Sequence, residues 1–102
     1  MAQIKPYYSV IFTSTRTDGD NGYSEMALKM EDLARQQPGF LELESARSEV
    51  GITISYWESL EAIADWKANT DHLMAQRKGI KDWYQWYKVR ICVVEREYDF
   101  QK

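Results

Sequence analysis

The sequence predicts a single α+β domain of ferredoxin-like type that works as a homodimer. Three observations support this: the order of elements (strand, helix, strand, strand, helices, strand), a last strand of unusual length, and the small size of the chain, which has 102 residues of which 44% are hydrophobic. A chain of this length buries only roughly 60 to 70% of its unfolded surface, so association with a second copy would add considerable stability. We expect one domain over residues 1–102.

The first strand is predicted over Tyr7–Arg16, which is rich in β-branched and aromatic residues on both faces. Residues 18–22 break that pattern and offer several side chains that can cap a helix. From Tyr23 onward, apolar residues recur every three or four positions, which indicates an amphipathic helix. Pro38 and Gly39 end this helix, because proline cannot continue the hydrogen-bond ladder.

Two further strands, over Phe40–Arg47 and residues 52–57, are predicted to form a hairpin. Ser59 is a suitable N-cap for a second helix, and apolar residues follow it at helical spacing. Asn69 or Thr70 can cap a further short helix, which Gly79 would end.

The last element, over residues 87–100, alternates well beyond the roughly 5 to 6 residues that are usual for a strand. Its apolar residues also change face between the first and the second half: Tyr87, Val89, Ile91 and Val93, then Val94, Tyr98 and Phe100. A strand that buries opposite faces in its two halves is expected to leave its own sheet and pack against that of a partner. Right-handed crossovers place the helices on one face of the sheet, so the other face needs a second sheet.

The composition disfavours several classes of partner. The formal net charge is -3 and the Lys and Arg residues form no basic stripe, so we expect no nucleic acid. Cys92 is the only cysteine, which excludes an internal disulfide and fits a reducing cytoplasm. No stretch approaches the roughly 20 apolar residues of a membrane span, so we expect a soluble cytoplasmic protein without a membrane partner.

No phosphate-binding loop, nucleophile elbow or paired metal-ligand motif occurs, so no protein-ligated metal is expected. The notable feature is aromatic: four Trp, seven Tyr and three Phe, many of them between residues 56 and 87. Large rings can serve core packing or line a flat apolar pocket. His72 is either a solvated side chain or a general base, since an imidazole pKa near 6.5 suits removal of a phenolic or enolic proton. Arg77 could hold an anionic substrate or simply add solubility.

A set of short motifs gives the chain a family resemblance. Gln37-Pro38-Gly39-Phe40 after an amphipathic helix, then Ser55-Tyr56-Trp57-Glu58-Ser59, Trp66, His72, Ala75 and Gly79, together resemble the antibiotic biosynthesis monooxygenase family. The resemblance runs from Tyr8 to Phe100. It implies a dimeric α/β barrel, in which two ferredoxin-like sheets pack face to face and the last strand reaches across the dimer.

The resemblance also implies two kinds of chemistry. Some members oxidise polycyclic phenols with O₂, without metal or flavin, in a pocket between sheet and helices. Other members degrade haem with an Asn on the first strand, a Trp on the second helix and a His ten residues after that Trp. Here Trp66 matches the Trp, but Gln76 occupies the place of that His and the first strand has no Asn.

Three hypotheses follow: a cofactor-independent monooxygenase acting on a small aromatic molecule, a haem-binding or haem-degrading relative, and a non-catalytic small-molecule-binding dimer. For the first, we expect His72 and Trp66 to be catalytic and no cofactor to be needed, with haem as the alternative. The predicted substrate-binding residues are Phe12, Ser14, Tyr56, Arg77 and Trp83.

Overall fold

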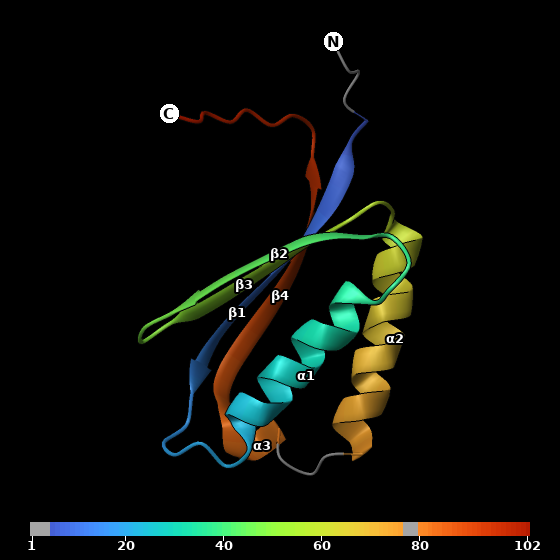
Figure 1. The fold of residues 1–102 in the computed structure, drawn as a ribbon. Coiled ribbons are helices and arrows are strands. Elements are labelled where there is room, and N and C mark those ends of the chain that lie inside the picture. Colours follow the sequence, from blue (N-terminus) through green and yellow to red (C-terminus); the bar gives the residue numbers. More distant parts are fainter. Residues whose placement is uncertain (1–4, 77–79) are drawn as a thin grey trace.

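The computed structural model describes the backbone of residues 5–76 and 80–102 and the side chains of residues 5–71 and 82–102. It contains a four-stranded antiparallel sheet with helices on one side, which confirms the α+β, ferredoxin-like fold class (Figure 1). In chain order the elements are β1 (Tyr7–Arg16), α1 (Tyr23–Arg35), β2 (Phe40–Arg47), β3 (Gly51–Trp57), α2 (Leu60–Gln76), α3 (Ile80–Trp83) and β4 (Tyr84–Val94).

The strands are ordered β2-β3-β1-β4, so β1 is paired on both edges. Ser14 of β1 lies opposite Gly51 of β3 and Tyr87 of β4, and these three positions therefore share one side of the sheet. Trp57 lies on the same side, six residues along β3 from Gly51, and stacks on Trp66 of α2. We call this the helix-facing side, and the other the open side.

Asp20 fixes the start of α1. Its Oδ1 accepts hydrogen bonds from the backbone N and the Oγ of Ser24, at 3.1 and 2.5 Å, and its Oδ2 accepts one from the N of Gly22 at 3.1 Å. These bonds favour the charged carboxylate and lower the pKa of Asp20, with the Ser24 hydroxyl as the largest cause. The N-cap residue is Gly22, and Asp20 is the member of the predicted residues 18–22 whose side chain bonds the first turn of α1.

The turn from α1 into β2 depends on Gly39. Its φ of 85° lies in the left-handed region that favours glycine, and a Cβ there would lie 2.7 Å from the Cβ of Ala62 on α2. Its carbonyl oxygen accepts a hydrogen bond from the N of Glu58 at 2.8 Å. Gly39 therefore allows the end of α1, the end of β3 and the start of α2 to meet closely.

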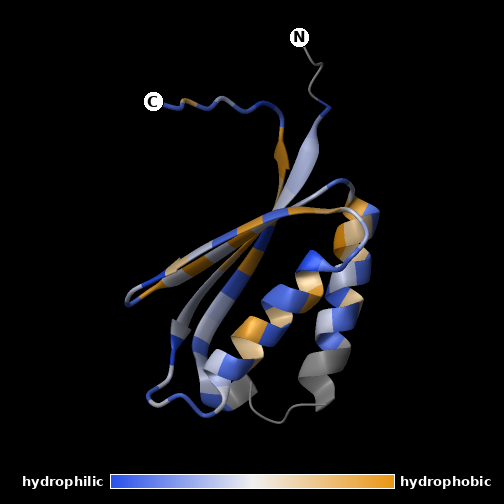
Figure 2. Ribbon diagram, in the orientation of Figure 1, coloured by the Kyte–Doolittle hydropathy of each residue, from blue (hydrophilic) through white to orange (hydrophobic). Residues whose placement is uncertain are grey.

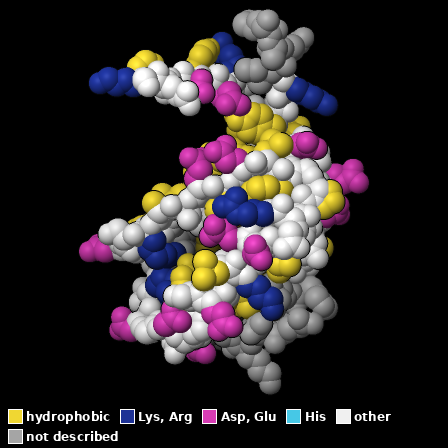
Figure 3. All heavy atoms as spheres, viewed as in Figure 1, with side chains coloured by type: hydrophobic (Ala, Val, Ile, Leu, Met, Phe, Trp, Pro, Cys, Tyr) yellow, Lys and Arg dark blue, Asp and Glu magenta, His cyan; other side chains and the backbone are white. Residues whose placement is uncertain are grey.

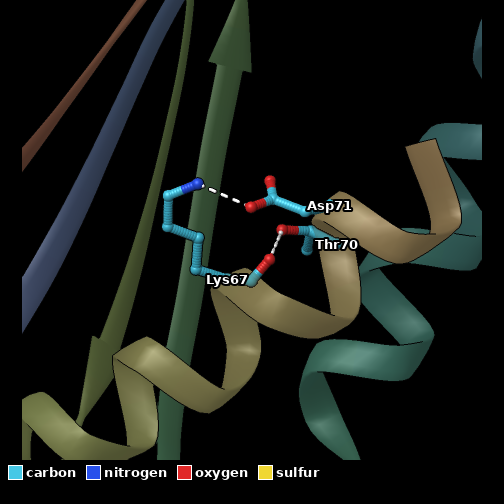
Figure 4. Close-up of polar contacts among 3 residues, drawn as sticks. All are labelled: Lys67, Thr70 and Asp71. Carbon is cyan, nitrogen blue, oxygen red and sulfur yellow. Dashed lines mark hydrogen bonds and ion pairs between the residues drawn. The ribbon is translucent and has the colours of Figure 1, made fainter. Parts of the chain in front are cut away.

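The second helix is one continuous element, so the prediction of a separate short helix starting at Asn69 or Thr70 is wrong. Both side chains bond backward within α2: Asn69 Nδ2 donates to the carbonyl of Asp65 at 3.1 Å, and Thr70 Oγ1 to that of Lys67 at 2.9 Å (Figure 4). An ion pair of 2.7 Å between Lys67 and Asp71 spans the expected break. At the start of α2, Ser59 Oγ accepts the Ala62 N–H at 3.0 Å, which confirms the predicted N-cap.

The hydrophobic core lies between the sheet and the helices. Trp57 is fully buried, stacks on Trp66 with ring centroids 5.9 Å apart, and meets the edge of Phe40 at 5.5 Å. Met26 and Ala34 bury the inner side of α1, and the hydrophobic and hydrophilic residues mixed along that helix agree with its predicted amphipathic character (Figure 2). Burial of these apolar side chains holds both helices on the sheet.

The last strand differs from the prediction at both ends. It begins at Tyr84 and ends at Val94, and residues 95–102 have no regular secondary structure. This segment projects away from the body of the domain, with Tyr98 and Phe100 85 and 86% exposed (Figures 1 and 3). Its anchoring contact is a 2.9 Å hydrogen bond from Tyr7 Oη to Glu97.

The surface carries acidic and basic side chains side by side over the face shown in Figure 3. This mixture agrees with the small net charge of -3. Within residues 5–76 and 80–102, the structure contains no helix that is both long and apolar enough to cross a membrane.

The packing of the α1–β2 turn can be tested by comparing two glycines with a left-handed backbone, Gly39 in that turn and Gly22 before α1. Gly22→Ala carries only the conformational cost, about 1 to 2 kcal/mol, because no atom lies within 4 Å of its added Cβ. Gly39→Ala carries a similar cost and also overlaps Ala62, so we expect it to lower the free energy of unfolding by roughly a further 1 to 3 kcal/mol. Urea denaturation measures both variants, and equal losses would show that the contact with Ala62 is not limiting.

Candidate active site

Three aromatic rings form a cluster on the helix-facing side of the sheet. Phe12 of β1 stacks on Tyr87 of β4, with ring centroids 5.3 Å apart and an interplanar angle of 20°. Tyr84 meets the edge of Phe12 at 5.5 Å and that of Tyr87 at 5.7 Å. Stacked and edge-to-face arrangements are the favoured geometries of aromatic pairs. We call Phe12, Tyr84 and Tyr87 the aromatic cluster.

A β-bulge allows Tyr84 and Tyr87 to share one side. Residues three apart on a regular strand point to opposite faces. Here the register between β1 and β4 shifts at Thr15 and Arg16, so that Arg16 lies opposite Tyr84. The extra residue in β4 turns Tyr84 back toward the helices.

Tyr23, the first residue of α1, joins this cluster to a cation. Its ring meets the edge of Tyr84 at 5.7 Å, and the guanidinium carbon of Arg16 lies 3.5 Å from its centroid. Arg16 also donates two hydrogen bonds to backbone carbonyls. Its Nε donates to Trp83, directly before β4, at 2.7 Å, and its Nη2 donates to Gly19, in the loop before α1, at 3.2 Å. Arg16 thus ties the end of β1, the loop before α1 and the start of β4 into one unit.

Arg47 brings a second guanidinium to the same place from β2. Its side chain crosses Gly51, its partner on β3, and its Nη2 donates to Ser14 Oγ on β1 at 2.5 Å. The guanidinium lies so close to the backbone of Gly51 that a Cβ at that position would collide with it. Arg47 Cζ is also 5.7 Å from the centroid of the Tyr23 ring.

The environment keeps the Tyr84 phenol neutral. Burial is the largest cause of its raised pKa, followed by the charge of Tyr23 and a hydrogen bond to it, while Arg47 and Arg16 act in the opposite direction. At neutral pH, Tyr84 is therefore a phenol that can donate or accept a hydrogen bond.

The aromatic cluster reaches the surface at the β4 edge. Ser14 is fully buried, whereas Tyr87 and its neighbour Val89 on the same side are 47 and 48% exposed. The arrangement combines a flat aromatic surface with a polar end formed by Ser14 and Arg47. An aromatic molecule could lie against the exposed rings and direct a polar substituent toward that end.

Comparison with known proteins identifies the family. The family model described as antibiotic biosynthesis monooxygenase matches residues 6–78. The chain belongs to this family. Over 99 residues it is 48% identical to the uncharacterised protein YqjZ of Bacillus subtilis (strain 168), covering 95% of this chain and 87% of YqjZ. The resemblance predicted from the Pro-Gly-Phe turn and the Ser-Tyr-Trp motif is confirmed.

Solved structures of similar fold include an oxygenase and a porphyrin-bound protein. SnoaB of Streptomyces nogalater, a cofactor-independent oxygenase, is 11% identical with a TM-score of 0.68, covering 96% of this chain and 100% of SnoaB. A point mutant of MhuD, with two manganese protoporphyrin IX molecules bound per active site, is 20% identical with a TM-score of 0.66, covering 91% of this chain and 99% of MhuD. At these identities, the likeness is one of fold.

The structure brings together only some of the predicted site residues of this monooxygenase family member. Phe12 and Ser14 lie in or beside the aromatic cluster, as expected for residues of one strand on the same side of the sheet. Trp83 is buried, donates its indole N–H to the carbonyl of Asn21 at 2.8 Å and meets the edge of Tyr23 at 6.5 Å. Trp83 therefore supports the cluster indirectly, through its contact with Tyr23.

The predicted catalytic residues belong to α2. Trp66 stacks on Trp57. In the register Trp57 lies opposite Tyr8, which is six residues along β1 from Ser14. Trp66 therefore packs toward the other end of the sheet from Arg47. His72 is part of the same helix, but its side chain lies outside the described residues, as does Arg77 altogether.

Tyr56 does not share a space with Phe12 and Ser14. It alternates with Trp57 along β3 and so lies on the open side, where its ring meets the edge of Tyr7 at 6.0 Å. Its hydroxyl donates to Glu44 Oε1 at 2.8 Å. Tyr56 therefore lies on the opposite side of the sheet from Phe12 and Ser14, and its role in substrate binding stays a prediction.

Sequence reasoning missed Tyr23 and Arg47 as candidate site residues. The structure begins β3 at Gly51, one residue before the predicted strand, and this start pairs Gly51 with Arg47 and leaves no side chain to block it. Tyr23 could have been found as the first inward-facing position of α1. The inclusion of Tyr84 required the bulge, for which the sequence gives no clear signal.

The described side chains form no cluster that could hold a metal ion. No three His, Cys, Asp or Glu side chains within the described set come together as a metal site requires. Cys92 lies opposite Ser9 on the open side of the sheet. Phe12, at a helix-facing position of β1, contacts two tyrosines of β4.

The bond between Tyr56 and Glu44 predicts a pH dependence at the open side. The hydrogen bond to Glu44, with burial and the carboxylate charge, raises the pKa of Tyr56 from 10.0 to about 12. The folded state then retains a proton that the unfolded state loses, so the stabilisation is complete below pH 10.0 and is lost as the pH rises through about 12.

Glu44→Gln should move the pKa of Tyr56 back toward its ordinary value. The phenolate absorbance of each protein, minus that of its Tyr56→Phe counterpart, isolates this one tyrosine. Glu49→Gln, in the hairpin turn, is the control of equal charge. An unchanged titration in Glu44→Gln would contradict the assignment.

Proposed function

We propose that this protein is a cofactor-independent monooxygenase that oxidises a small aromatic molecule with O₂. The substrate would be an anthrone or quinol whose C–H or O–H proton is acidic enough for a protein base to remove. The resulting carbanion reduces O₂ directly. For an anthrone, both C–H bonds of one methylene break, one oxygen atom forms the C=O group, and the other leaves as water with the two hydrogens.

The observation that carries this proposal is the partly exposed aromatic cluster beside Ser14 and Arg47. The stacked pair of Phe12 and Tyr87 offers a flat apolar surface, which suits a planar substrate. Membership of the monooxygenase family supports an oxidative reaction. The fold shared with SnoaB, a cofactor-independent oxygenase, supports chemistry in which the substrate itself activates oxygen.

The proposed catalytic roles fall to residues of α2. His72 would act as the general base, and Trp66 would contribute to the environment of the substrate. Arg77, which follows α2 in the sequence, would bind an anionic group. An imidazole with a pKa near its ordinary value is well suited to proton removal at neutral pH.

We also propose that the protein is a cytoplasmic homodimer formed through the open side of the sheet. This side presents Ile52, which is 43% exposed, and carries opposite charges at its two edges. Glu42 and Glu44 lie on β2, and Lys88 and Arg90 on β4. A two-fold axis along the strands would place the acidic edge of one sheet over the basic edge of the other.

An oxygen electrode tests the proposed reaction with an anthrone as the substrate. We expect O₂ consumption, and a loss of about 10²- to 10⁴-fold in kcat for His72→Ala, because a general base contributes that much. Trp66→Phe should also lower the rate. Trp86→Phe, on the open side opposite Thr15, is the control for loss of an indole, and sedimentation analysis shows whether this variant keeps the oligomeric state of the wild type.

The other hypotheses give different results in the same set of experiments. Full activity of both His72→Ala and Trp66→Phe would contradict the proposed site. Quenching of Trp fluorescence by aromatic ligands without O₂ consumption would indicate a binding protein. A Soret shift on haem titration that depends on His72 would favour the haem-binding alternative.

The projecting C-terminal segment tests the dimer. Tyr98 and Phe100 are largely exposed in one subunit, and contact with a partner would bury them. Truncation after Val94 should therefore give a monomer or aggregate in sedimentation analysis. Removal of residues 101–102 alone should leave the dimer intact, and a well-folded dimer after truncation at Val94 would contradict the role of the segment.

A further inference from the structure

We propose that Arg47, held over Gly51 and against Ser14, binds a negatively charged oxygen on an aromatic ligand whose rings lie against Phe12 and Tyr87. The ligand class is an aromatic carboxylate, enolate or phenolate. The proposal rests on the proposed function for the aromatic character of the ligand. It adds the charge of that ligand and the residue that recognises it.

The path of the Arg47 side chain is fixed by three strands. Arg47 starts on β2, crosses the Cα of Gly51 on β3 and reaches Ser14 Oγ on β1. Gly51 is buried, and it is the lack of a Cβ there that leaves room for the guanidinium. A long side chain held along such a path has lost part of its rotamer freedom before the ligand arrives, which favours binding.

Among the described residues, Arg47 uses little of its hydrogen-bonding capacity, which leaves donors for a ligand. A guanidinium has five N–H donors, and the side-chain hydrogen bond recorded for Arg47 is the one to Ser14. Among the described residues, the ion pairs join Arg35 with Glu31 and Lys67 with Asp71. Arg47 therefore has no described carboxylate partner, and its fork suits an anionic oxygen.

Arg16 lies against the same tyrosine but is occupied differently. Three backbone carbonyls, of Trp83, Gly19 and Asp20, accept hydrogen bonds from its guanidinium. The Cζ of Arg16 lies 3.5 Å from the centroid of the Tyr23 ring, whereas the Cζ of Arg47 lies 5.7 Å from it. This contrast assigns structural support to Arg16 and ligand binding to Arg47.

The aromatic cluster lies close enough to Arg47 for one ligand to contact both. Ser14 lies directly opposite Tyr87 in the register, and Phe12 is two residues away on the same side of β1. Two residues of a strand span about 7 Å. An anionic substituent bonded to Arg47 would therefore leave the attached rings over Phe12 and Tyr87.

Isothermal titration calorimetry at fixed, low ionic strength can compare two probes of the same shape, 2-naphthoate and 2-naphthamide. We expect the wild-type protein to prefer the carboxylate by about tenfold, as for a hydrogen bond to a charged group. Arg47→Gln should remove this preference through weaker binding of 2-naphthoate alone. Arg35→Gln, which removes an equal charge on α1, should retain it.

Gly51→Ala provides an independent test without any change of charge. Its new methyl group would meet the movable end of the Arg47 side chain, so the guanidinium should be displaced while the fold is kept. We expect Gly51→Ala to reproduce the loss seen in Arg47→Gln. Circular dichroism and the urea midpoint confirm that each variant is folded.

The outcomes separate this proposal from the proposed function. Equal binding of the two probes by the wild-type protein, or an undiminished preference in Arg47→Gln, would overturn the role of Arg47 even if anthrone oxidation is observed. A carboxylate preference lost in both Arg47→Gln and Gly51→Ala would support it, even in a protein that consumes no O₂.

Discussion

The pairing of β1 with strands on both of its edges is the constraint on which the candidate site depends. Ser14 has Gly51 on one side and Tyr87 on the other, and this register brings β2, β3 and β4 to one point on the helix-facing side. A shift of one residue would turn Phe12 and Ser14 to the open side. The burial of Trp57 against α2 opposes such a shift, since it would expose the largest fully buried side chain. Core packing at one end of the sheet thus maintains the site at the other.

The loop before α1 depends on the same end of the sheet. Thr17 donates its backbone N–H to the carbonyl of Trp83 at 3.1 Å, beside the bond from Arg16 to that carbonyl. These contacts fix where α1 begins, and hence where Tyr23 stands relative to Tyr84. Arg16 is engaged by these backbone carbonyls, whereas Arg47 approaches Tyr23 from β2 and bonds Ser14. The site therefore combines Arg16 as a structural support with Arg47 as a second, pre-positioned guanidinium.

The sequence predicted most of the fold because local patterns determine it. The bounds of β1 follow from its β-branched and aromatic composition, and the start of α1 follows from helical periodicity. The break predicted near Thr70 failed because a hydroxyl that can cap a helix can also bond back to the preceding turn. Alternation separates the two faces of each strand without saying how the face of Tyr56 and the face of Phe12 coincide. The way in which the faces coincide depends on strand register, which only the paired strands show. The bulge before Tyr87 is likewise visible only in the structure.

Core packing and the candidate site use different residues of this chain. The fold is shared with SnoaB and with the MhuD mutant, at 11 and 20% identity to this chain. Buried apolar side chains such as Trp57 and Met26 stabilise the sheet and helices here whatever the ligand is. Exposed positions on the helix-facing side are under no such constraint. Tyr87 and Arg47 occupy positions of that kind, and the specificity of this protein is therefore best sought where solvent meets the aromatic cluster.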